Sequence, residues 1–432
     1  MKNIKHYYVF YIIIVIALIF SACGNNKKNS NINNETTLIQ SNKERDTSLN
    51  IETAELNELV NGNTIFAIEF YKTICNQNSN IFFSPYSISV ALAMTYAGAK
   101  GDTELQIKDT MHFTLSQERL HPAFNFLDLE FAKRGKNAKA QDGKGFRLNI
   151  ANSIWGQKSY SFLTSFLDVL ALNYGAGLQV LDFQNAPEDS RITINNWVKE
   201  KTENRIDSVI PEGVITPDTR LVLTNAVYFN AAWLHTFNET STQESIFYLL
   251  DNSQVKVSMM NQAEEFAYTE GENFQAVELP YDGNELSMVI LLPQSGKFIE
   301  FENIFNSEKL DIIIDNLENR EITLKLPRFI YKSESVSLKN TLSSMGMPVA
   351  FSSAANFSGM DGTMSLSISD VVHQAFISVN EAGTEAAAST GVVTWAGIPE
   401  TEVNINRPFI FLIRDIKTKA ILFFGRIINP AE

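Results

Sequence analysis

Residues 381–399 read EAGTEAAASTGVVTWAGIP, a segment that is long for a connection between two strands. Every second position from Thr384 onward carries a small or β-branched, uncharged side chain, whereas the intervening positions include Glu385 and Trp395. Because side chains alternate between the two faces of a strand, the first set is suited to a buried face of a sheet. That set is Thr384, Ala386, Ala388, Thr390, Val392, Thr394 and Ala396.

The residues on either side of this stretch read as strands, at 375–380 and 403–413. By composition alone, 381–399 is a flexible Ala/Gly/Ser/Thr linker or a short Ala-rich helix. The alternation favours a different interpretation. We predict a loop that is exposed in one state of the protein and becomes a buried central strand in another.

The rest of the chain mixes predicted strands and helices. Short apolar or alternating runs at 221–229, 285–293 and 322–329 are typical of strands, and a small-residue run from Ile88 to Ala97 is typical of a closely packed helix. The elements show no strict βαβ rhythm, and no segment of 20 to 50 residues repeats. With no linker-like segment after about residue 55, we predict one large α+β domain over 56–432.

The first residues resemble an export signal. Lys2 and Lys5 precede the apolar run 7–20, which is too short for a permanent membrane span and ends in Ser21-Ala22-Cys23. This ending resembles a bacterial lipoprotein box with Phe20 in place of the usual Leu, so we predict a signal peptide over 1–22 and lipidation of Cys23. An ordinary signal with an incidental cysteine is the alternative.

The polar residues that follow the signal have little to bury. The segment 24–50, GNNKKNSNINNETTLIQSNKERDTSLN, is rich in Asn, Lys and Ser. We therefore predict a lipidated, disordered tether over 23–55. The protein is expected to be exported as a cell-envelope lipoprotein, periplasmic or surface-exposed, held at the membrane through the lipid on Cys23; secretion is the alternative.

Composition excludes several classes of function. The chain has 432 residues, 44% of them hydrophobic and 19% charged, which is the balance of a globular protein. Its formal net charge of −14 argues against nucleic acid as a partner. Only two cysteines occur and no Cys/His spacing typical of a zinc site is present, so we expect neither a metal nor a cofactor.

The sequence contains no recognisable catalytic motif. It lacks GxSxG, HExxH and a phosphate-binding glycine loop, and its five histidines form no motif with a nucleophile. His373 lies within the apolar run SDVVHQAFISV, where a buried hydrogen-bonding histidine is a better interpretation than a general base. We predict that the protein is not an enzyme.

Several motifs, in order, resemble the serpin family over residues 56 to the C-terminus. The hinge VNEAGTEAAAST at 379–390 and the run VNINRPFIFLI at 403–413 are similar to the family's mobile-loop hinge and to its signature after the loop. Further family-like segments are NIFFSPYSISVALAM, LTNAVYFNAAW, VSMMNQ, LPYDG and AFSSAANFSGM, with Asn356 where Asp is usual.

The resemblance implies a fold and a mechanism. The expected architecture is three β-sheets surrounded by helices, with an exposed reactive-centre loop at about 381–402. The implied activity is suicide inhibition by a monomer: a serine protease attacks the loop and forms a covalent acyl complex, and the cut loop enters the main sheet before water can release the protease. Cysteine proteases also form acyl-enzymes, so inhibition across classes stays possible.

Counting from the hinge predicts the bond that is cut. In inhibitory serpins the hinge glutamate, matched here by Glu381, lies sixteen residues before the residue that is cut, which gives Gly397-Ile398. Glycine fills no specificity pocket, so elastase-like or subtilisin-like proteases fit best. A shift by one residue gives Ala396, equally suited to elastase, and Trp395 would suit a chymotrypsin-like enzyme.

The resemblance also assigns roles in sheet opening. Trp233 matches the tryptophan at which insertion begins, and Glu381 with Arg328 matches a hinge ion pair. A hydrogen-bond cluster beneath the main sheet is matched by Ser84, Ser87, Asn225 and His373. The implied hinge residues are Glu381, Gly383, Thr384, Glu385, Ala386, Ala387, Ala388, Ser389 and Thr390.

Two other classes of protein compete with an inhibitor. A non-inhibitory serpin that acts as a carrier or structural lipoprotein would be expected to lose the small-residue hinge, which this chain keeps. An exported enzyme or glycan-binding lipoprotein is disfavoured by the lack of a catalytic constellation.

Overall fold

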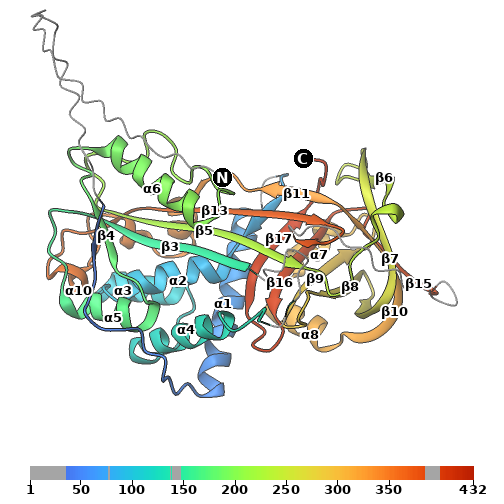
Figure 1. Ribbon diagram of the computed structural model, residues 1–432, viewed down its shortest axis with the longest axis horizontal. Coiled ribbons are helices and arrows are strands. Elements are labelled where there is room, and N and C mark those ends of the chain that lie inside the picture. Colours follow the sequence, from blue (N-terminus) through green and yellow to red (C-terminus); the bar gives the residue numbers. More distant parts are fainter. Residues whose placement is uncertain (1–35, 76–77, 137, 139–146, 385–398) are drawn as a thin grey trace, which may run out of the picture. The chain divides into compact units, whose positions relative to one another are not determined.

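The computed structural model describes residues 36–75, 78–136, 138, 147–384 and 399–432. Figure 1 shows two β-sheets with helices packed around them, so the prediction of a mixed α+β fold is confirmed. The ten described α-helices are α1 Thr53–Ile74, α2 Pro85–Tyr96, α3 Gly101–Thr110, α4 Gln117–Phe131, α5 Thr164–Tyr174, α6 Pro187–Lys201, α7 Phe298–Ile304, α8 Ser307–Asp315, α9 Lys339–Met345 and α10 Ser358–Asp361.

The main sheet has eight strands. Its order is β1-β4-β3-β5-β14-β13-β11, with β12 paired to β13. The central pair, β5 and β13, is parallel, and its register runs from Ile368 opposite Leu221 to Phe376 opposite Tyr228. The bounds are β1 Thr37–Ile39, β3 Arg147–Gln157, β4 Leu178–Leu181, β5 Leu221–Ala232, β11 Phe329–Lys332, β12 Val336–Ser337, β13 Ile368–Asn380 and β14 Gly383–Thr384.

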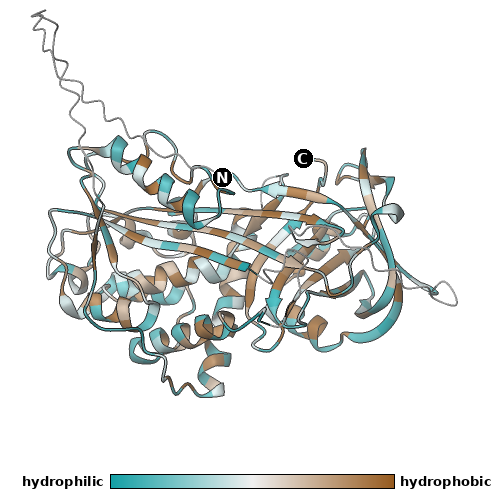
Figure 2. Cartoon of the chain, viewed as in Figure 1, coloured by the Kyte–Doolittle hydropathy of each residue, from teal (hydrophilic) through white to brown (hydrophobic). Residues whose placement is uncertain are grey.

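Strand β5 is buried along its whole length because both faces of the sheet are covered. Leu223 and Val227 face the large core that contains α2, whereas Val222 and Ala226 face a second core with Ile194 of α6. In Figure 1, α6 lies on one side of the sheet, and α1, α2 and α4 lie on the other. Hydropathy follows this arrangement, with long hydrophobic stretches on the strands and a mixture of hydrophobic and hydrophilic residues on α6 (Figure 2).

The second sheet has nine strands, in the order β15-β10-β7-β8-β9-β16-β17-β2 with β6 paired to β7. The resemblance implied two further sheets, but hydrogen bonding joins them into one. The reason is the length of β7, which pairs with β6 and β10 and also with β8. The bounds are β2 Ile81–Phe83, β6 Gln243–Tyr248, β7 Gln254–Gly271, β8 Phe274–Pro280, β9 Leu286–Pro293, β10 Glu318–Pro327, β15 Thr401–Asn404, β16 Phe409–Asp415 and β17 Ile421–Ile427.

The prediction of a disordered tether up to residue 55 is wrong for residues 36–55. Strand β1 pairs antiparallel with β4 at the edge of the main sheet, and residues 53–55 already belong to α1. Arg45 donates to Asn125 (2.7 Å) and to Asp128 (2.7 Å), and the fully buried Asn125 amide donates to the carbonyl of Asp46 (2.8 Å). Composition could not show this, because polar side chains and backbone groups make the contacts.

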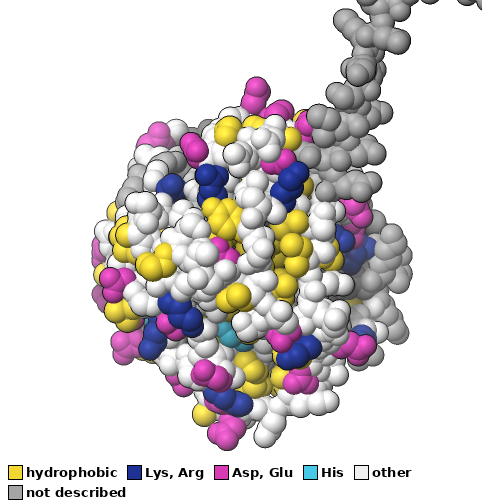
Figure 3. Space-filling view, turned by 90° about the vertical axis from the view of Figure 1, so that its left-hand side faces the viewer, with side chains coloured by type: hydrophobic (Ala, Val, Ile, Leu, Met, Phe, Trp, Pro, Cys, Tyr) yellow, Lys and Arg dark blue, Asp and Glu magenta, His cyan; other side chains and the backbone are white. Residues whose placement is uncertain are grey.

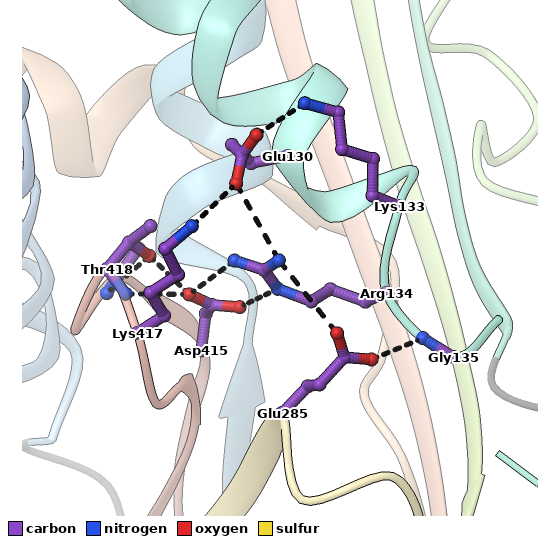
Figure 4. A network of polar contacts seen from close by, with 9 residues as sticks. Glu130, Lys133, Arg134, Gly135, Glu285, Asp415, Lys417 and Thr418 are labelled. Carbon is purple, nitrogen blue, oxygen red and sulfur yellow. Dashed lines mark hydrogen bonds and ion pairs between the residues drawn. The ribbon is translucent and has the colours of Figure 1, made fainter. Parts of the chain in front are cut away.

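A buried ionic network ties α4 to the second sheet (Figure 4). Arg134, just after α4, donates through Nε to Asp415 at the end of β16 (2.6 Å), and the Asp415 side chain is fully buried. Glu285 accepts from the backbone of Gly135 (2.7 Å). Since removal of one partner would leave a buried charge uncompensated, this network holds the two regions together. Two lysines and a threonine extend the network: Lys133 and Lys417 pair with Glu130, and the backbone N–H of Thr418 donates to Asp415.

Charges of both signs are distributed over the surface. On the face shown in Figure 3, Lys and Arg side chains alternate with Asp and Glu side chains and with scattered hydrophobic ones. Neither sign forms a continuous patch on that face. Among the described residues, no helix is both long and apolar enough to cross a membrane.

Candidate functional site

The start of the 381–399 segment lies inside the main sheet. Gly383 and Thr384 form β14, which pairs with β5 at Ala231 and Ala232 and on its other side with the end of β13. Further from the hinge, from Leu221 to Tyr228 of β5, β5 and β13 pair directly with each other. The hinge therefore occupies only the end of a slot between two strands, and the sheet must separate further before more of the segment can enter.

Gly383 is required by the closeness of β5. Its φ of +154° lies in a region that residues other than glycine rarely adopt. A Cβ atom added there would lie 2.2 Å from the carbonyl oxygen of Ala231 and 2.6 Å from Cα of Ala232. Because both contacts are with backbone atoms, only glycine allows this close approach.

Trp233 lies directly beside the hinge. Its indole Nε1 donates to the carbonyl of Asn380 (3.0 Å), and its backbone N–H donates to the carbonyl of Ala382 (2.9 Å). The indole stacks on Tyr281, with ring centroids 4.6 Å apart and an interplanar angle of 10°. The structure thus brings the predicted Trp233 to the hinge and adds Tyr281, which the sequence analysis did not single out.

Glu381 and Arg328 form an ion pair at the base of the hinge. The distance from Arg328 Nη2 to Glu381 Oε1 is 2.5 Å, and the Glu381 side chain is 4% exposed. Thr242 donates to the same carboxylate oxygen (2.6 Å). Burial alone would raise the pKa of Glu381, but the hydrogen bonds from Arg328 and Thr242 outweigh it and hold that pKa below its ordinary value.

The predicted polar cluster lies on the α2 side of the main sheet. Asn225 on β5 donates to Ser87 Oγ (2.5 Å) and accepts from Nδ1 of His373 on β13. Ser84 caps α2, and its backbone N–H donates to Nε2 of His373 (3.3 Å). The Asn225–His373 bond therefore joins β5 to β13, the two strands between which the resemblance implies that the sheet opens.

The sequence analysis missed Asn152 on β3, the fifth member of this cluster. It accepts from Ser87 Oγ (2.8 Å) and from Asn225 Nδ2 (2.6 Å), so it connects a third strand to α2. One signal was present in the sequence. Asn152 shares a strand face with Ile150 and Ile154, and a polar residue between two core positions on a strand needs a partner.

Burial keeps His373 neutral. The side chain lies in the core, and desolvation lowers its pKa to about 3. Asn225 Oδ1 can only accept and the Ser84 N–H can only donate, so the hydrogen-bond pattern fixes the tautomer with its proton on Nδ1. His373 therefore fits the predicted structural role and is not placed as a general base.

Part of the predicted site lies outside the described residues. This holds for Cys23, for the upper hinge from Glu385 to Thr390, and for the candidate bond Gly397-Ile398 with its alternatives Ala396 and Trp395. The chain resumes before β15, which pairs parallel with β10 in the second sheet. Within the described parts of the chain, no three His, Cys, Asp or Glu side chains are grouped so that they could bind a metal ion.

These features define a class of protein. In this class, two residues near the start of a long segment, Gly383 and Thr384, pair between the central strands β5 and β13 of a sheet, and further along these two strands pair directly with each other.

Comparison with known proteins identifies the family. Residues 61–430 match the family profile described as "Serpin (serine protease inhibitor)". The chain is 41% identical to leukocyte elastase inhibitor A of Rattus norvegicus, over 87% of this chain and all of that protein, and 38% identical to an uncharacterized serpin-like protein of Thermococcus kodakarensis, over 87% and 86%. The chain belongs to the serpin family.

Solved structures agree with the fold. The thermophilic serpin tengpin in its native state aligns with a TM-score of 0.78 and 32% identity, covering 91% of this chain and all of tengpin. Uncleaved ovalbumin aligns with a TM-score of 0.77 and 29% identity, covering 86% of this chain and all of ovalbumin. The expected serpin fold is therefore confirmed.

Proposed function

We propose that this serpin is a suicide inhibitor of serine proteases that works by inserting its cut loop into its own main sheet. The observation that carries the proposal is the position of Gly383 and Thr384 between β5 and β13. Insertion needs a strand-forming loop, a slot to receive it and a hinge that can lead it in. The alternating small residues can form the strand. The line along which β5 and β13 pair, here called the β5–β13 seam, can open to receive it, and β14 is the hinge that leads it in.

The proposed reaction starts as ordinary proteolysis. The serine hydroxyl of the protease attacks the carbonyl carbon of Gly397, the bond to the nitrogen of Ile398 breaks, and that nitrogen leaves as an amine after taking up a proton. The acyl-enzyme ester then joins Gly397 to the protease. Insertion carries the protease away from its point of attack, and distortion of its active site stops the hydrolysis that would complete the reaction.

The driving force is the pairing and burial of the loop. Each new hydrogen bond contributes about 0.5–1.5 kcal/mol net, and burial of apolar side chains contributes about 25 cal/mol per Å². Over the residues that follow Thr384, up to Gly397, the sum is on the order of 10 kcal/mol. The uninserted state persists because the sheet must first separate along the β5–β13 seam, so its stability is kinetic.

The proposed targets are elastase-like or subtilisin-like proteases outside the cell. Gly397, or Ala396 after a shift by one residue, offers a small side chain to the protease, and the relatives named leukocyte elastase inhibitor support this choice. Inhibition of cysteine proteases extends the proposal, because they pass through a thioester acyl-enzyme.

We further propose that the protein is exported and anchored by lipid on Cys23. The support is the sequence of residues 1–23 alone. Mass spectrometry of the mature N-terminus would detect the acyl chains. Cys23→Ala should move the protein from the membrane fraction to the soluble fraction, and an unchanged distribution would contradict the anchor.

The test of inhibition mixes the purified domain with an elastase-type serine protease. A denaturant-resistant adduct near the sum of the two masses, with a released peptide that begins at Ile398, is the expected result. Thr384→Arg serves as the control, because a charge at this buried position between β5 and β13 should displace the hinge and give cleavage without adduct. Cleavage without any adduct by the unmodified chain, across several serine proteases, would refute the proposal.

A further inference from the structure

A hydrogen bond joins the hinge to a tyrosine far away in the sequence. The hydroxyl of Tyr281, in the turn between β8 and β9, lies 2.8 Å from Oγ1 of Thr384. Tyr281 is 1% exposed and Thr384 is 0% exposed, so water does not compete for this bond. Thr384 is also the first residue of the alternating set that is suited to a buried strand face.

The tyrosine ring is fixed on several sides. It stacks on Trp233 and meets Phe229 edge-on, with centroids 5.1 Å apart and an interplanar angle of 75°. The backbone of Tyr281 is held as well: its N–H donates to the carbonyl of Leu286 (2.9 Å), and it forms a β-bridge with Trp233 at the end of β5. These contacts hold the Tyr281 hydroxyl in position without any help from the hinge.

A fixed hydroxyl selects one register for the hinge. With Thr384 opposite Val379 on β13 and Ala231 on β5, its side chain points toward Tyr281. A slip of one residue would turn Thr384 to the other face of the sheet and leave both hydroxyls buried without this partner. A register error at the hinge would be carried through the whole inserting strand.

We propose that Tyr281 is a positioning residue for inhibition: its hydroxyl holds Thr384 in register between β5 and β13 before cleavage, so that insertion starts from a strand end already in place. This inference rests on the proposed function. Fixing the backbone of Gly383 and Thr384 costs conformational entropy. The hydrogen bond to Tyr281 offsets part of this entropy loss before the acyl-enzyme forms. When the acyl-enzyme forms, insertion then starts from a residue that is already paired, while hydrolysis has still to occur.

The test uses variants that remove one hydroxyl without changing shape. Tyr281→Phe and Thr384→Val each remove one side of the bond, and the double variant tests whether the two act through the same contact. Tyr268→Phe is the matched control, since Tyr268 is another buried ring in the second sheet whose hydroxyl bonds Glu270 (2.8 Å), away from the hinge.

The first readout is amide hydrogen exchange of the peptide that spans the hinge, which requires no protease. Exchange should be about two- to tenfold faster in Tyr281→Phe and in Thr384→Val, no faster in the double variant than in either single one, and unchanged in Tyr268→Phe. Unchanged exchange in Tyr281→Phe would overturn the inference.

The second readout is the number of serpin molecules consumed for each protease molecule trapped. Loss of the Tyr281 hydroxyl should raise this number about two- to tenfold while the rate of the first attack stays the same. Faster exchange without a change in this number would mean that the bond only stabilises the uncut state, and the role in insertion would be wrong. If the unmodified chain traps no protease, the proposed function fails instead, and hinge exchange still decides whether Tyr281 holds Thr384.

Discussion

The indole nitrogen of Trp233, which follows β5, donates a hydrogen bond of 3.0 Å to the carbonyl of Asn380, the last residue of β13. The two strands that must separate are therefore tied together at the point where the hinge enters. Between the same two strands, lower down, Asn225 accepts from His373. In the proposed mechanism, sheet opening has to break both contacts, and they would then contribute to the kinetic barrier that preserves the uninserted state.

The close approach of Gly383 to β5 predicts the effect of adding one methyl group. In Gly383→Ala the Cβ atom would meet the Ala231 carbonyl oxygen at 2.2 Å, so the hinge would be displaced from the sheet. We expect more cleaved product and less adduct, by about tenfold or more, because backbone atoms of a central strand cannot move aside at low cost. Gly213→Ala is the control, because Gly213 also has a positive φ (+82°) but open space around it, so alanine there adds backbone strain without a clash at the hinge.

The Glu381–Arg328 ion pair predicts a pH dependence at the hinge. The pKa of Glu381 is held below its ordinary value, so the pair contributes stability at neutral pH that is lost as the pH falls through this lowered pKa. Arg328→Gln should destabilise the hinge by about 1–3 kcal/mol at pH 7. Hinge hydrogen exchange in the unmodified chain should approach that of the variant in acid.

The control for this experiment is Lys325→Gln. Lys325 pairs with Glu402 at 2.9 Å, but both side chains are substantially exposed, so its loss should cost less than about 1 kcal/mol. An equal effect of the two substitutions on hinge exchange would contradict a specific role for Arg328.

Asn152 is expected to matter as much as the members of the polar cluster that were predicted. In Asn152→Ala, Ser87 and Asn225 each lose a hydrogen-bond partner in the core, which should cost about 1–3 kcal/mol. Thermal unfolding of the uncut protein measures this loss. Asn149→Ala, on the same strand but bonded to the exposed Glu203 side chain, should have little effect; equal losses would argue against the cluster.

His373 and His121 predict acid sensitivity of the fold. Burial lowers their pKa values to about 3 and about 4, so between pH 6.5 and these values the unfolded chain binds protons that the folded chain does not. Stability should fall as the pH drops below 6.5, by up to about 1.4 kcal/mol per pH unit for each histidine. Imidazole NMR should show both rings neutral at pH 5; a protonated His373 there would refute this.

The ordered segment before α1 predicts a cost of truncation. A chain that begins at Ile51 would lose β1 and leave Asn125 without Arg45 and the Asp46 carbonyl. The buried Asn125 side chain would keep only its bond to the carbonyl of Leu172 (3.1 Å), so we expect a loss of about 1–3 kcal/mol from this side chain alone, seen as a lower unfolding temperature. Lys43→Ala, which removes only a half-exposed pair with Asp168, should cost less than about 1 kcal/mol. Equal temperatures for truncated and full chains would contradict the structure here.

Much of this site could be predicted from local pattern. Alternation from Thr384 onward indicated a strand-competent segment, and motif order indicated the family that the comparisons confirm. The cluster members Ser84, Asn225 and His373 were also named from the sequence. Family motifs made these cluster members recognisable because each motif is a run of neighbouring residues, whereas the strand capacity of the residues after Thr384 stays a prediction.

Other features depended on which distant residues meet. The sequence named LPYDG only as a motif, and nothing local indicates that Tyr281 bonds Thr384, 103 residues away. Likewise, the polar residues 36–50 looked unable to bury anything, yet their side chains and carbonyls satisfy Asn125 and Asp128 on α4.

The alternating pattern was enough to predict that the small-residue segment could form a strand, because the face of each side chain follows from the two-residue period of an extended backbone. The three-dimensional fold was needed to show that Gly383 and Thr384 already lie between β5 and β13, and which side chains hold them there. Hydrogen bonds and close contacts depend on atomic distances between segments that the fold brings together, and no local pattern encodes those distances.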